Sequence, residues 1–314
     1  MRMPVSSTVM SRAEHVPGRA LDWRVDRIRR RTSDYNRTVF HGGGNTMTMT
    51  MRLSAVALLS VLAVSGAWAQ TGSDRAVTEA QYEQWKAELT NWGRWGANDE
   101  IGALNLITPA KRLEAVALVE EGFTVSLAGD ADTVEAVDNP RPYQHEMVGI
   151  SSDRISVQYH GIAHTHLDAL AHINDDGVFY NGYAPDADEV IANGHPKNSI
   201  HNLKNGIVTR GVLMDIARLK GVPWLEPGTP IYIEDLEEWE EQAGVRVSSG
   251  DALFIRTGVW PRREAEGPWL RGRRPGGSQA GLHPSVIPWL KQRDIALLGS
   301  DHPTYVSPSE LPGA

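Results

Sequence analysis

The chain has 314 residues, no cysteine and a net charge of −8 at neutral pH. The lack of cysteine excludes disulfides, thiolate metal ligands and a cysteine nucleophile, so any bound metal must use nitrogen and oxygen ligands. Residues 70–314 alone hold 35 acidic and 21 basic side chains, which argues against nucleic acid as a partner.

Residues 51–69 are typical of a secretory signal peptide. A basic residue precedes an apolar run over residues 54–64, and the segment ends on the small-x-small cleavage site Ala67-Trp68-Ala69. The run is shorter than the roughly 20 residues that a membrane span needs. We therefore expect cleavage after Ala69 and a periplasmic or secreted product without a membrane anchor.

The signal peptide separates two further segments of the chain. Residues 1–50 are rich in arginine and show no hydrophobic periodicity, so we interpret them as a disordered extension from a start codon assigned too far upstream. Residues 70–314 contain no low-complexity linker, and their length suits one large domain.

The domain opens with an acidic segment that predicts a helix over residues 78–89. A loop rich in tryptophan, glycine and asparagine follows at residues 91–105. Thr108 as N-cap and Pro109 in the first turn predict a second helix that runs to about Glu121. Residues 123–128 are predicted to form a strand.

The next segment, residues 155–168, alternates in the manner of a half-buried strand. Its odd positions are mostly apolar, whereas its even positions carry His160, His164, His166 and Asp168. Because successive strand side chains point to opposite faces, this pattern predicts one packed face and one face that bears imidazoles and a carboxylate.

Downstream, residues 174–199 are rich in Asp, Gly, Asn and Pro and predict a long loop that borders a site. Strands are predicted at residues 206–216, 252–257 and 295–298, and helices at 233–243 and 283–291. Strands that alternate with helices indicate an α/β or mixed α+β fold.

The clustered histidines predict a metal site. His166 and Asp168 stand two apart on one strand face, and two histidines with a carboxylate and an open position are the usual catalytic zinc arrangement. His164 could supply the remaining ligand, as could His160 if a bulge at Gly161 re-aims it.

His172 follows Asp168 by four residues. If a helical turn begins there, His172 lies beside the metal as a catalytic acid or base.

Residues 165–172, Thr-His-Leu-Asp-Ala-Leu-Ala-His, resemble the cyclase-like metal-dependent hydrolase family, which includes kynurenine formamidases and isatin hydrolases. Further motifs that carry the resemblance lie at residues 95–105, 180–182, 210–215, 250–258 and 299–301. The resemblance implies a swivelling β/β/α fold with a barrel-like mixed sheet, homodimers or larger assemblies, and one or two Zn²⁺ or Mn²⁺ ions. It also implies that His166 and Asp168 are metal ligands and that His172 is the acid/base.

The chain departs from the family pattern in two places. The family's first histidine precedes the second by four residues, where this chain has Ile162, so His160 or His164 must take that role; the His160-Gly161 pair favours His160. The family also has a later His and Glu that complete the metal site. Here the chain ends thirteen residues after Asp301, so we expect a C-terminal truncation. We interpret His302 as a structural residue.

The resulting hypothesis is a hydrolase in which metal-activated water cleaves a C–N bond of an amide, aryl formamide, lactam or imide. Trp92, Trp95 and Tyr183 could form an aromatic wall for a flat small-molecule substrate. One alternative is a non-catalytic periplasmic metal-binding homologue inactivated by the truncation. Another is a metal-dependent lyase or dehydratase.

Overall fold

The computed structural model describes residues 75–160, 162–272, 275–309 and 311. The predicted N-terminal extension, the signal peptide and the bulge at Gly161 lie outside these residues. Within them, no helix has the length and apolar character to cross a membrane.

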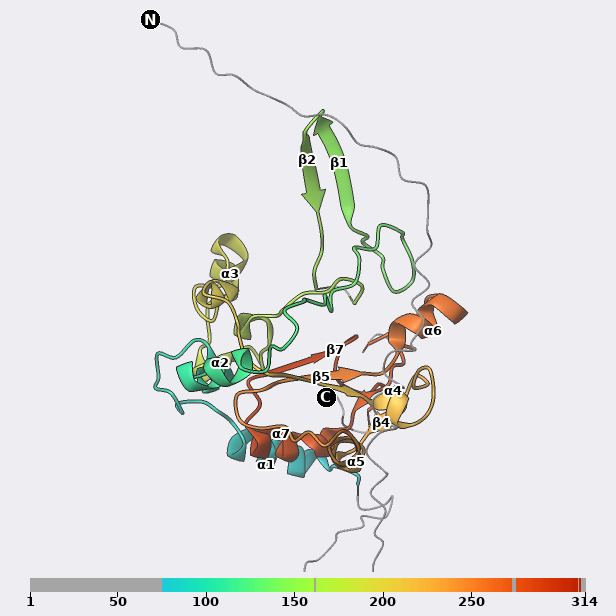
Figure 1. Cartoon of the computed structure of the whole chain (residues 1–314). Helices are drawn as coiled ribbons and strands as arrows, with labels where there is room; N and C mark the ends of the chain where they lie inside the picture. The colour runs from blue at the N-terminus through green and yellow to red at the C-terminus, as the bar shows by residue number, and fades with distance from the viewer. Residues whose placement is uncertain (1–74, 161, 273–274, 310, 312–314) are drawn as a thin grey trace, which may run out of the picture. The chain divides into compact units, whose positions relative to one another are not determined.

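The described helices and strands form a mixed α+β fold (Figure 1). The helices are α1 (Glu79–Glu88), α2 (Pro109–Val116), α3 (Ala187–Asn193), α4 (Ile216–Leu219), α5 (Ile233–Ala243), α6 (Val259–Glu266) and α7 (Ile287–Arg293). The strands are β1 (Gln144–Gly149), β2 (Ser152–Ser156), β3 (Gly211–Asp215), β4 (Pro230–Ile231), β5 (Ala252–Arg256), β6 (Gly281–Leu282) and β7 (Leu297–Ser300).

The strands are divided among three sheets, so the mixed α+β class is confirmed. The sheets are a parallel β3-β5-β7 sheet, a parallel β4-β6 pair and an antiparallel β1-β2 hairpin. The expectation of a barrel-like sheet is wrong for the described residues, because these strands close no barrel.

The β3-β5-β7 sheet carries the core. Parallel strands require crossover connections, which α4 and α5 supply between β3 and β5 and α6 and α7 supply between β5 and β7. Figure 1 shows α5 and α7 on one side of this sheet. The buried cluster includes side chains of β3, β5, α5 and α7: Val212, Met214, Leu253, Ile255, Leu236 and Trp289.

A glycine on β7 permits close packing within this sheet. Gly299 pairs with Phe254 of β5, and a Cβ at Gly299 would lie 2.6 Å from Cδ1 of that ring. Any larger residue would therefore have to displace the Phe254 ring.

Local signals located the starts of α1, α2 and α5, whereas α3, α4 and α6 were not predicted. Thr78 caps α1 by accepting the Gln81 backbone N–H at 3.2 Å, and Thr108 caps α2 in the same way with Pro109 in the first turn. The prediction for α5 is confirmed over its full range. The helix at α2 ends at Val116 instead of near Glu121, and the predicted helix at 283–291 is a 3-10 turn followed by α7.

Two predicted strands are wrong. Residues 123–128 form no strand, and Phe123 and Val125 are about 70% exposed. The strand predicted over 155–168 ends at Ser156, which pairs with Gln144. Continuing this register would place Pro142 opposite Gln158, and proline has no N–H to donate to the ladder.

The long loop predicted at 174–199 also needs correction, because it contains α3 and the 3-10 turn Tyr180–Gly182. Asp186 caps α3 by accepting the backbone N–H of Glu189 at 3.0 Å.

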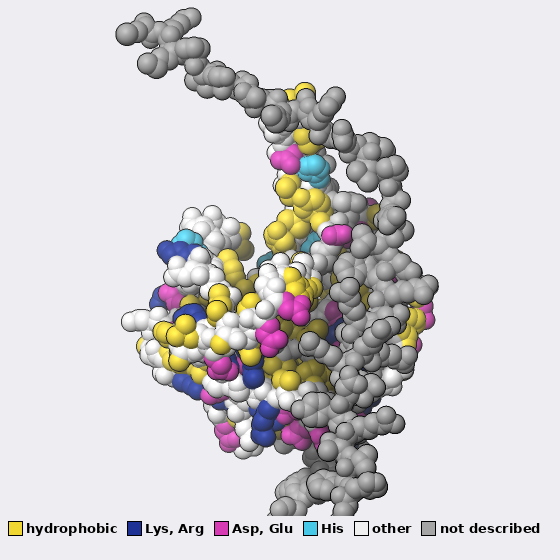
Figure 2. Space-filling model, viewed as in Figure 1, with side chains coloured by type: hydrophobic (Ala, Val, Ile, Leu, Met, Phe, Trp, Pro, Cys, Tyr) yellow, Lys and Arg dark blue, Asp and Glu magenta, His cyan; other side chains and the backbone are white. Residues whose placement is uncertain are grey.

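The β1-β2 hairpin is exposed along its entire length. It bears the apolar side chains Met147, Val148 and Ile155, each more than half exposed. Figure 2 shows apolar side chains along this part of the surface. A two-stranded hairpin is marginally stable alone, so this element contributes little to the stability of the described fold.

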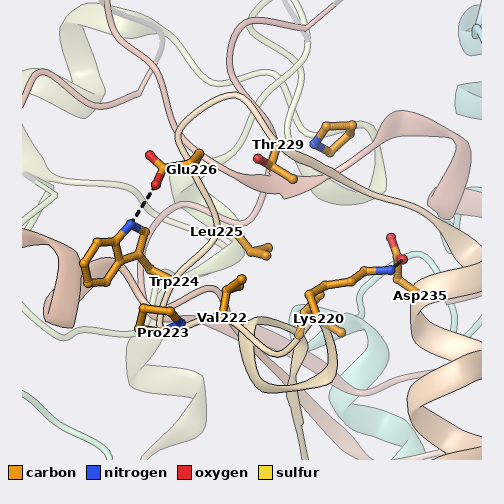
Figure 3. A pocket seen from close by; sticks show the side chains of 10 residues that line it. Lys220, Val222, Pro223, Trp224, Leu225, Glu226, Thr229 and Asp235 are labelled. Atoms are coloured by element: carbon orange, nitrogen blue, oxygen red, sulfur yellow. Dashed lines mark hydrogen bonds and ion pairs between the residues drawn. The ribbon is translucent and has the colours of Figure 1, made fainter.

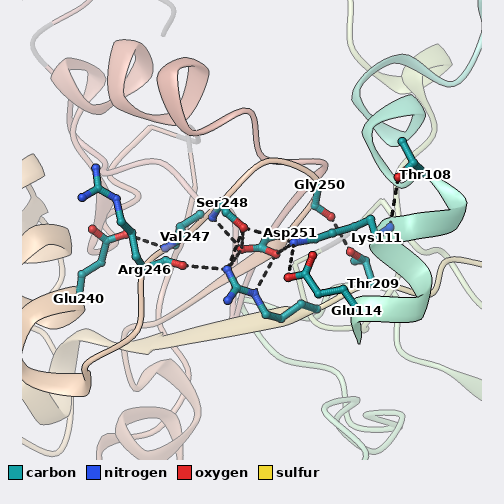
Figure 4. A network of polar contacts seen from close by, with 11 residues as sticks. Thr108, Lys111, Glu114, Thr209, Glu240, Arg246, Val247, Ser248, Gly250 and Asp251 are labelled. Carbon is teal, nitrogen blue, oxygen red and sulfur yellow. Dashed lines mark hydrogen bonds and ion pairs between the residues drawn. The ribbon is translucent and has the colours of Figure 1, made fainter. Parts of the chain in front are cut away.

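Asp251 is the centre of a polar network that joins α2 to the sheet (Figure 4). This fully buried carboxylate accepts hydrogen bonds from Arg210 and from the backbone N–H of Ser248, and Lys111 Nζ lies 2.7 Å away. Burial alone would raise the pKa of Asp251, but the hydrogen bonds from Arg210, Lys111 and Ser248 outweigh it and hold the pKa below its ordinary value.

We predict that Asp251→Asn lowers the free energy of unfolding by about 3–5 kcal/mol at pH 7, because it removes the buried carboxylate that Lys111 and Arg210 share. A carboxylate with a lowered pKa stabilises the fold above its unfolded pKa and loses this effect as the pH falls through the folded value. The gap between wild type and variant should therefore narrow below about pH 4.

Urea unfolding across this pH range tests the prediction. Glu146→Gln, which breaks the exposed ion pair with Arg154, is the matched control and should cost less than about 1 kcal/mol. Equal losses in the two variants, or a gap that does not change with pH, would contradict the assigned role of Asp251.

Candidate metal centre

The predicted histidines and aspartate lie on an irregular loop that follows β2. After Ser156 the chain passes through a turn at residues 159–160 and bends at 162–164, and it reaches the 3-10 turn η2 (Leu170–His172). This path gathers four side chains that a straight strand would spread out. They are His160, His166, Asp168 and His172.

Asp168 is the common neighbour of the three imidazoles. Its Oδ1 lies 3.2 Å from His160 Nδ1 and 3.4 Å from His166 Nε2. Its other oxygen, Oδ2, lies 3.9 Å from His172 Nε2. The carboxylate therefore has two sides, one facing His160 and His166 and one facing His172.

His166 is held in the tautomer that a metal ligand requires. Its Nδ1 lies 2.7 Å from the carbonyl oxygen of His164, and because a carbonyl only accepts, Nδ1 must carry the proton. In the neutral ring, Nε2 then has a free lone pair on the side of Asp168. A backbone carbonyl on the second ring nitrogen is a common feature of metal-binding histidines.

His172 is placed by the backbone turn that the sequence suggested. Its N–H donates to the carbonyl of Ala169, and the N–H of Ala171 donates to the carbonyl of Asn198 at 3.1 Å. The His172 ring stacks on His160 with centroids 4.0 Å apart. His172 thus contacts both the carboxylate and a candidate ligand.

Of the two histidines that competed for one role, the structure brings His160 into this cluster. Both ring nitrogens of His164 are buried and make no hydrogen bond within the described residues. His164 contributes its carbonyl oxygen, which orients His166.

The donor set fits a divalent ion with nitrogen and oxygen ligands. Ligands about 2.1 Å from a tetrahedral ion lie about 3.4 Å from one another, close to the separations of His160 and His166 from Asp168 Oδ1. Among the described residues, the group whose ligand atoms all lie within 4.8 Å of one another is His160, Asp168 and His172, and this group is a second possible set. His166 is not in that group, although its Nε2 lies 3.4 Å from Asp168 Oδ1. We favour the set with His166 because the His164 carbonyl holds its Nδ1 and leaves Nε2 free for an ion.

His302 is partly buried and hydrogen-bonded to Thr257, which agrees with its interpretation as a structural residue. Thr257 Oγ1 donates to Asp301 Oδ1, so it accepts a hydrogen bond from His302 Nε2 at 2.9 Å. Burial lowers the pKa of His302 and favours the neutral ring. Asp301 accepts the backbone N–H of Thr257, Gly258 and Val259, and so stabilises the start of α6.

The described contacts of the predicted aromatic wall do not include the four side chains of the candidate centre, and the histidine that Tyr183 contacts is His195. Trp92 lies against Gly182, Arg94 stacks over Trp95, and Lys197 Nζ lies 5.2 Å from the ring centroid of Tyr183. The role of these aromatic rings in substrate binding stays a prediction.

Tyr183 also lines a cavity of about 200 Å³ together with Lys197 and Asn198. The carbonyl of Asn198 accepts the N–H of Ala171, so this cavity lies beside the turn that carries His172. Of the three aromatic residues, Tyr183 has the closest described link to the candidate centre.

Another cavity, of about 470 Å³, is formed by different elements (Figure 3). Its walls come from α4, the segment from Val222 to Pro230 and Asp235 of α5, and the indole N–H of Trp224 donates to Glu226 at one side. None of the candidate ligands lines it.

Comparison with known proteins supports the sequence resemblance. The family model Cyclase, described as "Putative cyclase", matches residues 124–305. A crystal structure of a novel cyclase is 30% identical with a TM-score of 0.59, and the match covers 70% of this chain and 76% of the other.

A more distant match is isatin hydrolase A from Ralstonia solanacearum, which is 19% identical over 60% of this chain and 69% of its own. Its TM-score of 0.39 is too low to support an inference about this chain. No curated protein matches the sequence.

Proposed function

Since the chain belongs to the cyclase family, we propose that it is a metal-dependent hydrolase that cleaves the C–N bond of an amide, aryl formamide, lactam or imide. The observation that carries this proposal is the two-sided Asp168 carboxylate. Its Oδ1 lies 3.2 Å from His160 and 3.4 Å from His166, and its Oδ2 faces His172.

In this proposal His160, His166 and Asp168 hold one Zn²⁺ or Mn²⁺ ion. A bound divalent ion supplies a Lewis acid and lowers the pKa of water toward neutrality. The three residues provide two neutral nitrogens and one negative oxygen, which leaves a position open for water or substrate. His164 contributes by fixing the orientation of the His166 ring through its carbonyl.

His172 acts as the general acid and base. Imidazole is the side chain that gains and loses a proton most readily near neutral pH. Asp168 Oδ2 lies 3.9 Å from His172 Nε2, so the ring is next to the carboxylate that would hold the ion. The stacked His160 ring limits the movement of His172. His172 would accept a proton from the attacking water and deliver it to the leaving nitrogen.

We further propose that the enzyme is exported and acts as a homodimer or larger homo-oligomer. The signal-like residues 51–69 support export. The exposed apolar side chains of the β1-β2 hairpin support contact with another copy.

The proposed function predicts metal binding together with water-consuming cleavage. The full chain is loaded with Zn²⁺ or Mn²⁺, its metal content is measured, and it is assayed on an aryl formamide, isatin, a cyclic imide and a lactone. We expect about one bound ion per chain and turnover of at least one C–N substrate with uptake of one water.

Other outcomes separate the rival functions. Bound metal without turnover of any compound in the panel would favour a non-catalytic metal-binding protein. A lyase or dehydratase would form product from a hydroxy acid without net uptake of water.

A further inference from the structure

A fully buried arginine links the core to the loop that carries the candidate ligands. Asp138 has no exposed surface and accepts hydrogen bonds from two arginines. Arg263 donates to it through Nε at 2.7 Å and Nη2 at 3.1 Å, and Arg271 donates through Nη2 at 3.1 Å. Arg271 is itself fully buried, whereas the Arg263 side chain is 21% exposed.

Only one of these two arginines is described as reaching the loop. Arg271 Nη2 also donates to the carbonyl oxygen of Ile162 at 3.3 Å. Ile162 lies two residues after His160 and two before His164, so this hydrogen bond holds the centre of the ligand loop. The rings of Trp260 and Trp269, each 5.3 Å from Arg271 Cζ, restrict movement of the guanidinium.

The loop has few other anchors. Residues 157–169 belong to no described strand or helix. Within the described part of the chain, Arg141 donates to the side-chain oxygen of Gln158, the Ile162 carbonyl accepts from Arg271, and Thr165 Oγ1 accepts the N–H of Gly129. The His164 carbonyl binds His166 within the loop itself. The Arg271 contact ties the loop to a fully buried carboxylate.

Burial of a charged guanidinium carries a desolvation penalty unless the charge is paired. The buried carboxylate of Asp138 pairs with Arg271 and offsets this penalty. A metal site requires its ligands to be held within about 0.5 Å of their working positions. A shift of the Ile162 backbone would move His160 relative to Asp168 and change the 3.2 Å separation.

We infer that Arg271 is a positioning residue, which fixes the Ile162 backbone so that His160 lies at ligand spacing from Asp168. This inference rests on the proposed function. It concerns a residue 109 positions after Ile162, for which the sequence offered no signal.

The experiment compares Arg271→Met with Arg263→Met in the full chain. Both variants remove one arginine from Asp138 and leave the other, but only the first removes the described hydrogen bond to the loop. Hydrogen-deuterium exchange of the metal-free protein is followed for peptides covering residues 157–172, and Zn²⁺ affinity is measured by competition with a chelator. Arg271→Lys retains the positive charge but lacks the planar guanidinium with its several N–H donors. This variant replaces Arg271→Met in the experiment if the methionine variant fails to fold.

Arg271→Met should increase exchange in residues 157–172 and weaken Zn²⁺ binding about tenfold, with Arg271→Lys intermediate and Arg263→Met near wild type. Exchange that is unchanged in the Arg271 variants, or increased equally in Arg263→Met, would overturn the inference whatever the metal affinity. Failure of the wild-type chain to bind Zn²⁺ would overturn the proposed function instead, and the metal-free exchange measurement would still decide the role of Arg271.

Discussion

Asp168→Asn is expected to remove metal binding and hydrolysis together. Asp168 is the carboxylate that all three imidazoles of the cluster face, and its Oδ1 lies within 3.4 Å of two of them. An asparagine of the same shape has no negative charge and is a weak ligand for Zn²⁺ or Mn²⁺. We expect the Zn²⁺ affinity to fall by at least about 100-fold and turnover to be lost.

Isothermal titration with Zn²⁺ and the substrate panel measure this effect. Asp153→Asn is the matched control, because Asp153 also lies 2.9 Å from a histidine, His145, but on the exposed hairpin. The control should keep both metal affinity and turnover. An Asp168→Asn protein that still binds Zn²⁺ as tightly as the wild type would place the metal elsewhere.

His172→Ala should separate metal binding from catalysis. General acid-base catalysis contributes about 10²- to 10⁴-fold, so kcat should fall by that factor. Because His172 faces Asp168 Oδ2 and the ligand pair faces Oδ1, the Zn²⁺ affinity should stay close to the wild-type value.

The same variant also distinguishes the two possible ligand sets. If His160, Asp168 and His172 form the metal site, His172→Ala will lose Zn²⁺ affinity along with activity. His145→Ala, which removes an exposed histidine of the hairpin, is the control for the loss of an imidazole. A His172→Ala protein with unchanged kcat would contradict the proposed acid/base role.

Several features could be predicted because they depend on neighbouring residues. Thr78 and Thr108 satisfy the free N–H groups of the helices that follow them, so their caps lie where the sequence placed them. The helix over 233–243 and the strands near 211–215 and 252–256 also agree with their hydrophobic patterns. The high density of His and Asp within thirteen positions was enough to identify the residue cluster.

The backbone conformation of the segment that carries the cluster could not be predicted from its alternation of apolar and polar residues. A strand exists only where a partner supplies hydrogen bonds, and the positions that would pair beyond Ser156 lead into Pro142 and Pro140. The loss of the ladder lets the chain bend, and the bend brings His160 to within 3.2 Å of Asp168.

The sequence by itself determined which side chains could do the chemistry, because residue type sets the ligand atoms and the proton donors. Only the tertiary structure placed His160 beside Asp168, since that contact depends on the fold of the loop. It also brought Arg271 to Ile162 from more than one hundred residues away. Such a contact depends on how distant segments pack, and no local pattern of residues encodes it.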